Sequence, residues 1–333
     1  MTAPETIPAD DLRVRPLRQA DARGVAVLVA DYFTELGTIG GMSVEQTEQL
    51  FATSWLEGGC GLVLENGSEI TGYGFVRPSQ WRGSDTVQFG LTLKQGYRDR
   101  QVHRILTDPL LTAAIEVARE HRINNICMHL RVCDTCHPPV MLELGFQEDP
   151  VSMLGFSHDL KAIPNRPLPQ GLRFRPARLP EESPALMDMM ASVFDDRDRQ
   201  GEPLAESYLA LIAAKPGFDP EQMLVVEDSN GMVAGSIIDA TAPGGNSSIL
   251  QVGVRRDHRR RGIGSALVSR QLNWLKARGA GAALAGMFST NIAATLFWRL
   301  GFRPDPQRTF RFFLRDTAPA ANQNHGGTDD ALS

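Results

Sequence analysis

Apolar positions follow two spacings along the chain, and segments of the two kinds succeed one another from end to end. Alternating or β-branched runs predict strands, and runs with helical spacing predict helices. In the first half, the predicted strands are 12–17, 61–65, 70–77, 86–93, 126–132 and 153–158, and the predicted helices are 22–36, 44–56, 99–121 and 138–144. In the second half, after a segment at 172–176 that repeats the first strand, the predicted strands are 223–227, 233–240, 248–254, 282–288 and 309–315, and the predicted helices are 183–194, 204–214, 265–278 and 291–300.

The two halves also share short pieces of sequence. The segment LRVRP at 12–16 recurs as LRFRP at 172–176, and Leu-Gly-Phe at 144–146 recurs at 300–302. Each half then predicts one order of elements: strand, two helices, three strands, helix, strand, helix, strand. Such self-similarity indicates that one supersecondary arrangement occurs twice in the chain. We expect a first domain at 1–160, a Pro-rich linker at 161–170, a second domain at 171–316 and a disordered tail at 317–333.

Composition narrows the class of protein. With 333 residues, 42% hydrophobic and 22% charged, the chain can build two globular cores. The net charge of -5 argues against a nucleic-acid partner, and no apolar run reaches the length of a membrane span. The N-terminal stretch MTAPETIPADD lacks the basic and apolar regions of a signal peptide, so we expect a cytoplasmic protein.

The four cysteines include a CxxCH sequence at 133–137. This spacing is used for covalent haem attachment, but that attachment occurs outside the cytoplasm, so we interpret it as coincidence. A metal site formed by His129, Cys133, Cys136 and His137 has suitable ligands but lacks a second CxxC. Reduced thiols without a metal are the preferred interpretation.

The most informative stretch is VGVRRDHRRRGIGSAL at 252–267. A β-branched strand leads into a basic loop, then into Gly262 and Gly264, and then into a helix. Glycines allow close approach of a ligand, and the N–H groups of a helix N-terminus attract anions. The stretch predicts a phosphate-binding loop, although neither the ATP-binding P-loop nor the dinucleotide-binding glycine pattern is present.

The pattern Arg-x-x-Gly-x-Gly at 259–264 resembles the acyl-CoA pyrophosphate loop of the GNAT superfamily of N-acetyltransferases, and the following helix, strand, helix and Gly301-Phe302 extend the resemblance. It implies an α/β fold (α+β, mixed sheet) of two tandem GNAT-like domains, each with a mixed, mostly antiparallel sheet flanked by helices. It also implies acetyl-CoA or another acyl-CoA as cofactor. The implied cofactor-binding residues are Val252, Gly253, Val254, Arg259, Arg260, Arg261, Gly262, Ile263, Gly264, Ser265, Asn291 and Phe297.

The catalytic groups are less well defined. The family commonly has a Tyr, which protonates the departing thiolate, where this chain has Phe297. Asn291 is one of two choices, with Thr290, for the Asn that often contacts CoA. Asp239 is a weak candidate for the general base, because we expect it near the end of the strand beside Val252. The acidic segment 194–202 could receive a cationic amine, or it could be a solvated loop.

The first copy departs from the family pattern. Aligning 97–104 on 258–265 keeps the first arginine but replaces the two glycines with Gln101 and His103. Basic side chains still concentrate there, so anion binding is physically allowed. We expect either an empty scaffold or a cofactor held without reaction. The residues of this second CoA site would be Leu91, Leu93, Arg98, Arg100, Gln101, Val102, His103 and Arg104.

Two functions remain open. One is an acyl-CoA-dependent N-acyltransferase for a small-molecule amine, with catalysis in the second domain. The alternative is a non-catalytic acyl-CoA-binding or sensing protein, which the missing Tyr and the altered first copy both allow. A protein-modifying acetyltransferase is a lesser option. No nucleic-acid or membrane partner is expected, no metal is expected, and a homodimer is among the options for the oligomeric state.

Overall fold

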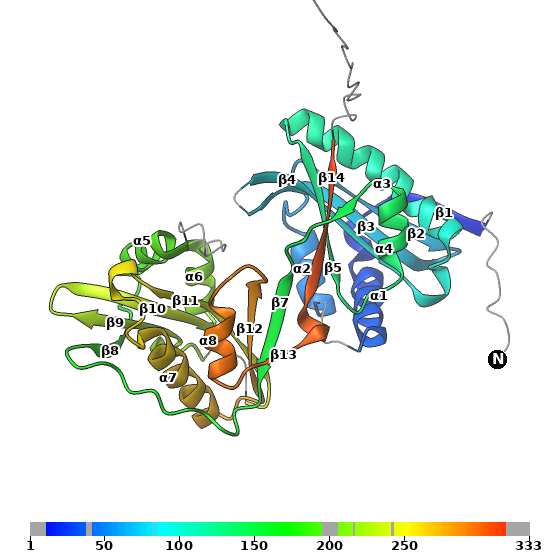
Figure 1. Cartoon of the computed structure of the whole chain (residues 1–333). Helices are drawn as coiled ribbons and strands as arrows, with labels where there is room; N and C mark the ends of the chain where they lie inside the picture. The colour runs from blue at the N-terminus through cyan, green and yellow to red at the C-terminus, as the bar shows by residue number, and fades with distance from the viewer. Residues whose placement is uncertain are drawn as a thin grey trace, which may run out of the picture. The chain divides into compact units, whose positions relative to one another are not determined.

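The computed structural model of the chain describes residues 11–37, 42–82, 84–194, 206–215, 217–240 and 243–317. The described residues fall into two compact units (Figure 1). Unit 1 draws on Met1–His129, Thr135–Glu148 and Phe312–Ser333, and unit 2 draws on Leu130–Asp134 and Asp149–Arg311. Each unit has a sheet with helices on both faces, as the repeated sequence pattern predicts.

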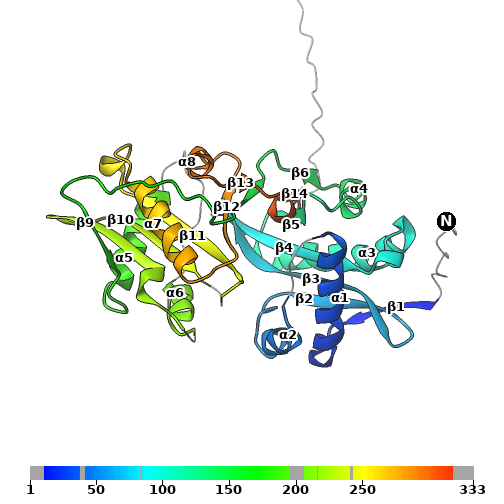
Figure 2. The same ribbon diagram turned by 90° about the horizontal axis from the view of Figure 1, so that it is seen from below.

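The sheet of unit 1 has the strand order β1-β2-β3-β4-β5-β14. Its first four strands pair antiparallel, and β4 pairs parallel with β5 because α3 crosses between them. Figure 2 shows α1 and α2 on one face of this sheet and α3 and α4 on the other. The strands are β1 Leu12–Pro16, β2 Cys60–Asn66, β3 Glu69–Trp81, β4 Ser84–Leu93, β5 Asn125–Arg131, β6 Gln147–Glu148, which pairs with β14, and β14 Phe310–Asp316. The helices are α1 Ala22–Glu35, α2 Val44–Phe51, α3 Arg100–His121 and α4 His137–Glu143.

The sheet of unit 2 has the strand order β7-β12-β11-β10-β9-β8. Among the strand pairs of the described residues here, β11 and β12 pair parallel, and α7 makes the crossover between these two strands. In Figure 1, α5 and α6 cover one face, and α7 and α8 cover the other. The strands are β7 Met153–His158, β8 Arg173–Pro176, β9 Met223–Asp228, β10 Gly231–Asp239, β11 Asn246–Val254, β12 Ala282–Phe288 and β13 Arg303–Pro304, which pairs with β7. The helices are α5 Ser183–Phe194, α6 Glu206–Ala213, α7 Ile263–Ala277 and α8 Ala294–Arg299.

The closing strands do not follow the order of the chain. By position in the sequence, β7 ends the first copy, yet it lies in unit 2 and pairs with β12. Most of β14 ends the second copy in sequence but lies in unit 1, beside β5. The expected boundaries at 160 and 171 therefore follow the repeat in the sequence, whereas the compact units each take their last strand from the other copy.

An arginine on the first strand of each copy holds two carboxylates. In unit 1, Arg15 Nη1 lies 2.7 Å from Asp21 Oδ2, and Arg15 Nε lies 2.8 Å from Glu65 Oε1. In unit 2, Arg175 Nη1 lies 2.6 Å from Glu182 Oε2 and its Nε lies 2.5 Å from Glu227 Oε2. The repeat at 12–16 and 172–176 thus preserves an ion-pair cluster as well as a strand.

The helices of the described residues include none that is long and apolar enough to cross a membrane.

Candidate functional site

The loop between β11 and α7 is shaped by contacts of its own residues. Arg259 Nε donates to the carbonyl of Val254 at 3.0 Å, so this guanidinium holds the loop against the end of the strand. His258 Nε2 lies 3.3 Å from Asp228 Oδ2 and ties the loop to β9. Hydrogen bonding to the His258 ring also lowers the pKa of Asp257. Two of the loop's polar side chains, Arg259 and His258, therefore have structural partners.

The start of α7 has no side-chain cap at its N-cap residue, Gly262. Gly262 precedes the helix with φ +84, a left-handed conformation that favours glycine, and it is exposed. The N–H groups of Ile263, Gly264 and Ser265 belong to the first helical turn, which has no intrahelical acceptors. The side chains of Arg260 and Arg261 are exposed beside them. This arrangement suits an anion such as a pyrophosphate.

Gly264 borders a space between three elements. A Cβ at this position would lie 3.5 Å from Leu296 Cδ2 of α8 and 3.6 Å from Val254 Cγ2 of β11. Both distances are ordinary contacts, so the fold itself accepts an alanine here. A larger side chain would extend into the region between α7, α8 and the end of β11.

The strand before the loop loses its partner on one side. The register between β11 and β12 runs from Asn246 opposite Ala282 to Ile249 opposite Ala285. Beyond it, β11 continues to Val254, while β12 stays paired with β7 as far as Phe288. Residues 250–254 therefore present an edge toward β12, and such an edge can hydrogen-bond an extended ligand.

The expected residues Val252, Gly253 and Val254 all lie on this edge. Val252 packs with the apolar cluster of α7 and α8, and Val254 packs with the cluster that contains Ile263. The structure thus brings the strand, the loop and the helix start of the predicted CoA site together at one place.

Two other expected cofactor contacts lie in α8 and just before it. Phe297 is 6% exposed, and its ring packs edge-on against Phe302 at 4.9 Å between centroids. Asn291 Oδ1 accepts the N–H of Ala293 at 2.9 Å and so caps its own turn. Phe297 contributes to the core of unit 2 and offers no hydroxyl group.

Asp239 lies farther from the strand edge than the sequence suggests. It is opposite Ser248, whereas Val252 is opposite Ser236. Asp239 is three positions after Ser236 in β10, which corresponds to roughly 10 Å along a strand. Lys215 Nζ lies 2.6 Å from Asp239 Oδ1, so this carboxylate already has a cationic partner. The acidic segment expected to bind the acceptor lies, after residue 194, outside the described residues.

The first copy has the same hydrogen bond from an arginine to the end of its strand, but a different helix N-terminus. After Leu91 and Leu93 of β4, Arg98 Nε donates to the carbonyl of Leu93 at 2.7 Å, as Arg259 does to Val254. However, Asp99 Oδ1 accepts the N–H groups of Gln101 and Val102 at 2.9 and 3.1 Å. The N-terminus of α3 therefore carries a carboxylate of the chain itself where α7 presents open N–H groups.

The basic residues expected at the second CoA site are ion-paired or buried. Arg98 pairs with Glu35, Arg100 Nε lies 2.8 Å from Glu143 Oε2, and Arg104 Nε lies 2.6 Å from Asp108 Oδ1. His103 is fully buried, and its ring lies 5.0 Å from that of His137. The expectation that His103 adds positive charge to an anion cradle is wrong, because the side chain points into the core of unit 1.

The residues of the CxxCH segment do not gather around a metal. The ring of His129 packs against Phe312 at 4.9 Å, whereas His137 lies against His103. Within the ranges that the structure describes, no group of three His, Cys, Asp or Glu side chains could hold a metal ion.

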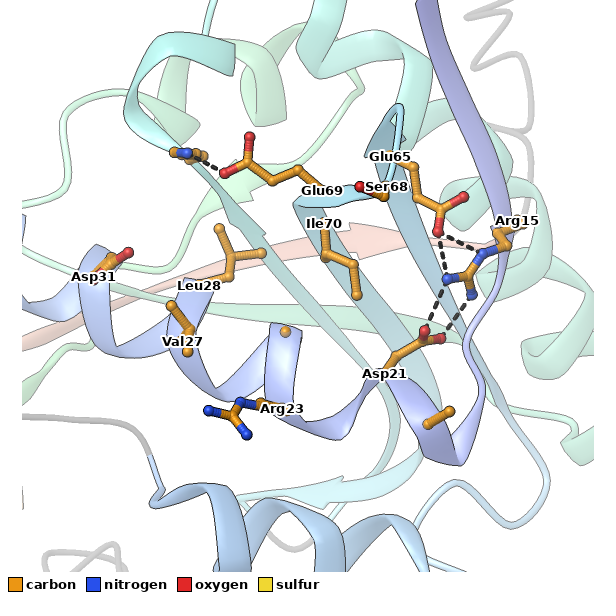
Figure 3. A pocket seen from close by; sticks show the side chains of 13 residues that line it. Arg15, Asp21, Arg23, Val27, Leu28, Asp31, Glu65, Ser68, Glu69 and Ile70 are labelled. Carbon is orange, nitrogen blue, oxygen red and sulfur yellow. Dashed lines mark hydrogen bonds and ion pairs between the residues drawn. The ribbon is translucent and has the colours of Figure 1, made fainter.

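A cavity of about 460 Å³ lies in unit 1, between α1 and the β2–β3 hairpin (Figure 3). Leu28 and Ile70 form its apolar part, and Arg15, Asp21 and Glu65 form the ion-pair cluster at one end. Its charges are largely paired with one another, and it was not predicted because its residues come from three separate segments.

Comparison with known proteins supports the family resemblance for part of the chain. Residues 188–302 match the model of the acetyltransferase (GNAT) family. The chain therefore carries a GNAT domain. The match runs from α5 to Phe302 and includes β11, the loop and α7. The resemblance inferred from Arg259, Gly262 and Gly264 is confirmed.

Two curated relatives are named mycothiol acetyltransferase. The protein of Saccharopolyspora erythraea is 24% identical over 247 residues, which are 72% of this chain and 81% of that relative. The protein of Clavibacter michiganensis subsp. michiganensis is 32% identical over 114 residues, which are 34% of this chain and 36% of that relative. These names support an acetyltransferase.

Solved structures extend the likeness to the whole chain. A GCN5-related N-acetyltransferase from Sphaerobacter thermophilus has a TM-score of 0.71 at 19% identity and covers 94% of this chain and 98% of its own. The tandem GNAT protein of the clavulanic acid biosynthesis pathway has a TM-score of 0.66 at 15% identity and covers 93% and 99%. The predicted fold class, two GNAT-like domains in tandem, is confirmed.

Proposed function

We propose that this protein is an acyl-CoA-dependent N-acyltransferase that transfers an acetyl group to a small-molecule amine in unit 2. One observation carries the proposal. The N-terminus of α7, with exposed Arg260 and Arg261, follows β11 after one loop, and the described residues 250–254 of β11 lie beyond the pairing with β12. A pyrophosphate and the extended arm attached to it need these two features side by side.

Different residues bind different parts of the acyl-CoA donor. Arg259 to Ser265 hold the pyrophosphate through backbone N–H groups and positive charge. Val252 to Val254 pair through their backbone with the pantetheine arm, and an N–H near Val254 stabilises the oxyanion of the tetrahedral intermediate. The amine attacks the thioester carbon, and the bond to sulfur breaks. Holding both reactants in place makes the reaction effectively unimolecular.

Proton transfer is the open part of this mechanism. A CoA thiol has a pKa of about 8.5, so its thiolate leaves without obligatory protonation, and Phe297 does not prevent turnover. The ammonium form of the acceptor must lose a proton first. Asp239 stays a weak prediction for this role, because it is ion-paired with Lys215 and lies three positions along β10 from Ser236, the residue opposite Val252. A water relay is the other route.

Unit 1 has a structural role in this proposal. Asp99 occupies the N–H groups at the start of α3, and His103 is packed against His137. These contacts favour a unit 1 that binds no acyl-CoA, rather than a unit 1 with a second acyl-CoA site.

The acceptor is proposed as a small amine of secondary metabolism, and the protein as cytoplasmic. The relatives' name, mycothiol acetyltransferase, supports acetyl as the transferred group. The missing tyrosine at Phe297 favours a second candidate, a non-catalytic acyl-CoA-binding protein.

Release of free CoA thiol distinguishes these candidates. The full chain is incubated with acetyl-CoA and a panel of small amines, and thiol is followed with a chromogenic disulfide reagent. Accessible cysteines of the chain, such as the exposed Cys136, react as well, so a sample without amine is subtracted. Amine-dependent thiol release supports the transferase. Tight acetyl-CoA binding without release for any amine of the panel supports the binding protein.

A further inference from the structure

The cavity of unit 1, between α1 and the β2–β3 hairpin, has a net negative lining (Figure 3). The charged residues that line it are three cations and four carboxylates: Arg15, Arg23, Lys94, Asp21, Asp31, Glu65 and Glu69. The lining includes none of residues 97–104, which align with the CoA loop of the second copy. The cavity is therefore separate from both acyl-CoA sites considered above, so what it binds is independent of the proposed function.

The end of the cavity at Arg15 has two carboxylates for one cation. Arg15 pairs with Asp21 and with Glu65. Both of its contacts to Glu65 go to Oε1, and Glu65 Oε2 has no hydrogen-bond donor among the described residues. The Glu65 side chain is 16% exposed, so its carboxylate is only partly hydrated. A cation beside Oε2 would stabilise this charge.

The second copy supplies that cation from its own chain. Glu227 occupies the position of Glu65 in the repeat. Its two oxygens accept from Arg175 Nε and Arg173 Nε at 2.5 and 2.6 Å. Arg13 corresponds to Arg173, but Arg13 is exposed and forms no ion pair within the described part of unit 1. The cluster in unit 1 therefore lacks one cation that its counterpart in unit 2 has.

The other end of the cavity is also net negative. In Figure 3, Glu69 and Asp31 lie on the side away from Arg15. Lys94 pairs with Glu69. This hydrogen bond raises the pKa of Lys94, and the charge of Asp31 adds to the shift, so both carboxylates act on the same ammonium group. Asp31 is exposed and has no ion pair among the described residues, which leaves its charge available to a ligand.

An apolar strip connects the two ends. It consists of Val27 and Leu28 of α1 and Ile70 of β3 (Figure 3). Val27 is 51% exposed although its side chain is wholly apolar. Gly24 lets Ile70 lie close to the helix, because a Cβ at Gly24 would be 2.8 Å from Ile70 Cδ1. A hydrocarbon chain laid on this strip would remove apolar surface from water.

We propose that the cavity binds a linear aliphatic diamine, with one ammonium group at Glu65, the hydrocarbon chain on the apolar strip and the other ammonium group at Asp31. The volume of about 460 Å³ is within the range of small-molecule sites. The alternative is a zwitterion, which could place a carboxylate at the exposed lining residue Arg23. A diamine matches both net negative ends, whereas the carboxylate of a zwitterion would face like charge at one of them.

Calorimetry on the full chain without acyl-CoA compares probes of equal length: 1,6-diaminohexane, hexylamine and 6-aminohexanoate. We expect the diamine to bind about fivefold more tightly than hexylamine, because it gains one exposed charge pair. We expect 6-aminohexanoate to bind more weakly than either amine. Added salt should weaken the diamine more than hexylamine, since the diamine has the second charge pair to be screened.

Variants locate the bound diamine. Asp31→Asn should remove the advantage of the diamine and leave hexylamine unchanged, a pattern that a structural role of Asp31 would not produce. Glu65→Gln should weaken both amines about fivefold. The matched control is Glu48→Gln, which neutralises an exposed carboxylate of α2 outside the cavity and should change neither constant. Thermal unfolding checks each variant, and Asp31→Asn, at an exposed position, serves if Glu65→Gln does not fold.

Four results would overturn the inference. If 6-aminohexanoate binds as tightly as the diamine, the cavity takes a zwitterion through Arg23. Equal losses in Glu48→Gln and Asp31→Asn would show unspecific attraction to surface charge. Diamine binding that Asp31→Asn leaves unchanged would place the diamine elsewhere on the chain. No binding of any probe at millimolar concentration would show that the cavity holds no such ligand. The release of CoA thiol tests the proposed function separately from all four.

Discussion

The substitution Gly264→His gives unit 2 the residue type that the first copy has at the equivalent position, His103. At the equivalent position of the first copy, His103 is fully buried between helices. In unit 2, the Cβ of a substituted residue 264 points toward Leu296 and Val254, with ordinary contact distances. A histidine there should therefore fold but fill the region through which the donor's arm reaches β11.

The expected loss follows from the contacts removed. Two strand-like hydrogen bonds contribute about 1 kcal/mol each. Roughly 100 Å² of apolar arm surface contributes about 2.5 kcal/mol at about 25 cal/mol per Å². Together they give about 4.5 kcal/mol, or on the order of 10³-fold in the Kd of CoA. Gly264→Ala, with a methyl group alone, should cost about 10-fold.

Calorimetry measures both the Kd and the number of CoA molecules bound per chain. We expect one per unaltered chain and none for Gly264→His at the same concentrations. The control is Gly279→Ala, at the end of α7, where φ is +73. It should lower the melting temperature, because a side chain is strained there by about 1–2 kcal/mol, yet keep CoA binding. An unchanged Kd in Gly264→His would refute the site. One molecule still bound to this variant would place CoA in unit 1.

Three further predictions concern capping and charge. Asp99→Ala should lower the free energy of unfolding by about 1 kcal/mol in urea, because α3 loses its cap, and a neutral result would mean that water replaces the carboxylate. Arg15→Gln should lower the free energy of unfolding by about 3 kcal/mol in urea, because Asp21 and Glu65 lose their arginine partner and are mostly buried. A loss below about 1 kcal/mol would contradict this. The Arg175 guanidinium lowers the pKa of Glu182 to about 2, so its contribution is complete above the ordinary pKa of about 4.5 and is lost as the pH falls from there toward 2. Glu182→Gln should remove about 2 kcal/mol at pH 7 and flatten the stability profile in that window, which thermal melts across pH can check.

The local sequence pattern was sufficient to predict most elements and to predict a loop with a helix start between β11 and α7. The strands 153–158 and 282–288 begin and end where alternation predicts. The loop from Arg259 to Ser265 was found because glycine and arginine spacing is a local property of the sequence. The ion pairs of Arg15 and Arg175 were implied by the repeat, but their partners come from other elements and needed the structure.

Two features of the first copy had signals in the sequence that were not used. Asp99 directly precedes a long helix, which is the usual position of a capping carboxylate. His103 lies three residues before Leu106 and seven before Leu110, so helical spacing places it on the buried face of α3. The exchange of β7 and β14 had no such signal, because strand partners are chosen by contacts distant in sequence.

The exchanged closing strands also govern the order in which the protein can be completed during synthesis. Unit 1 has all its other strands by Glu148, yet its last strand is made only at Phe312. At about 5–20 residues per second, the ribosome needs roughly 10–30 s for the intervening chain. During this time the edge of β5 has no partner from its own unit and is open to wrong pairing. Unit 2, which receives β7 before its other strands are made, has no comparable delay.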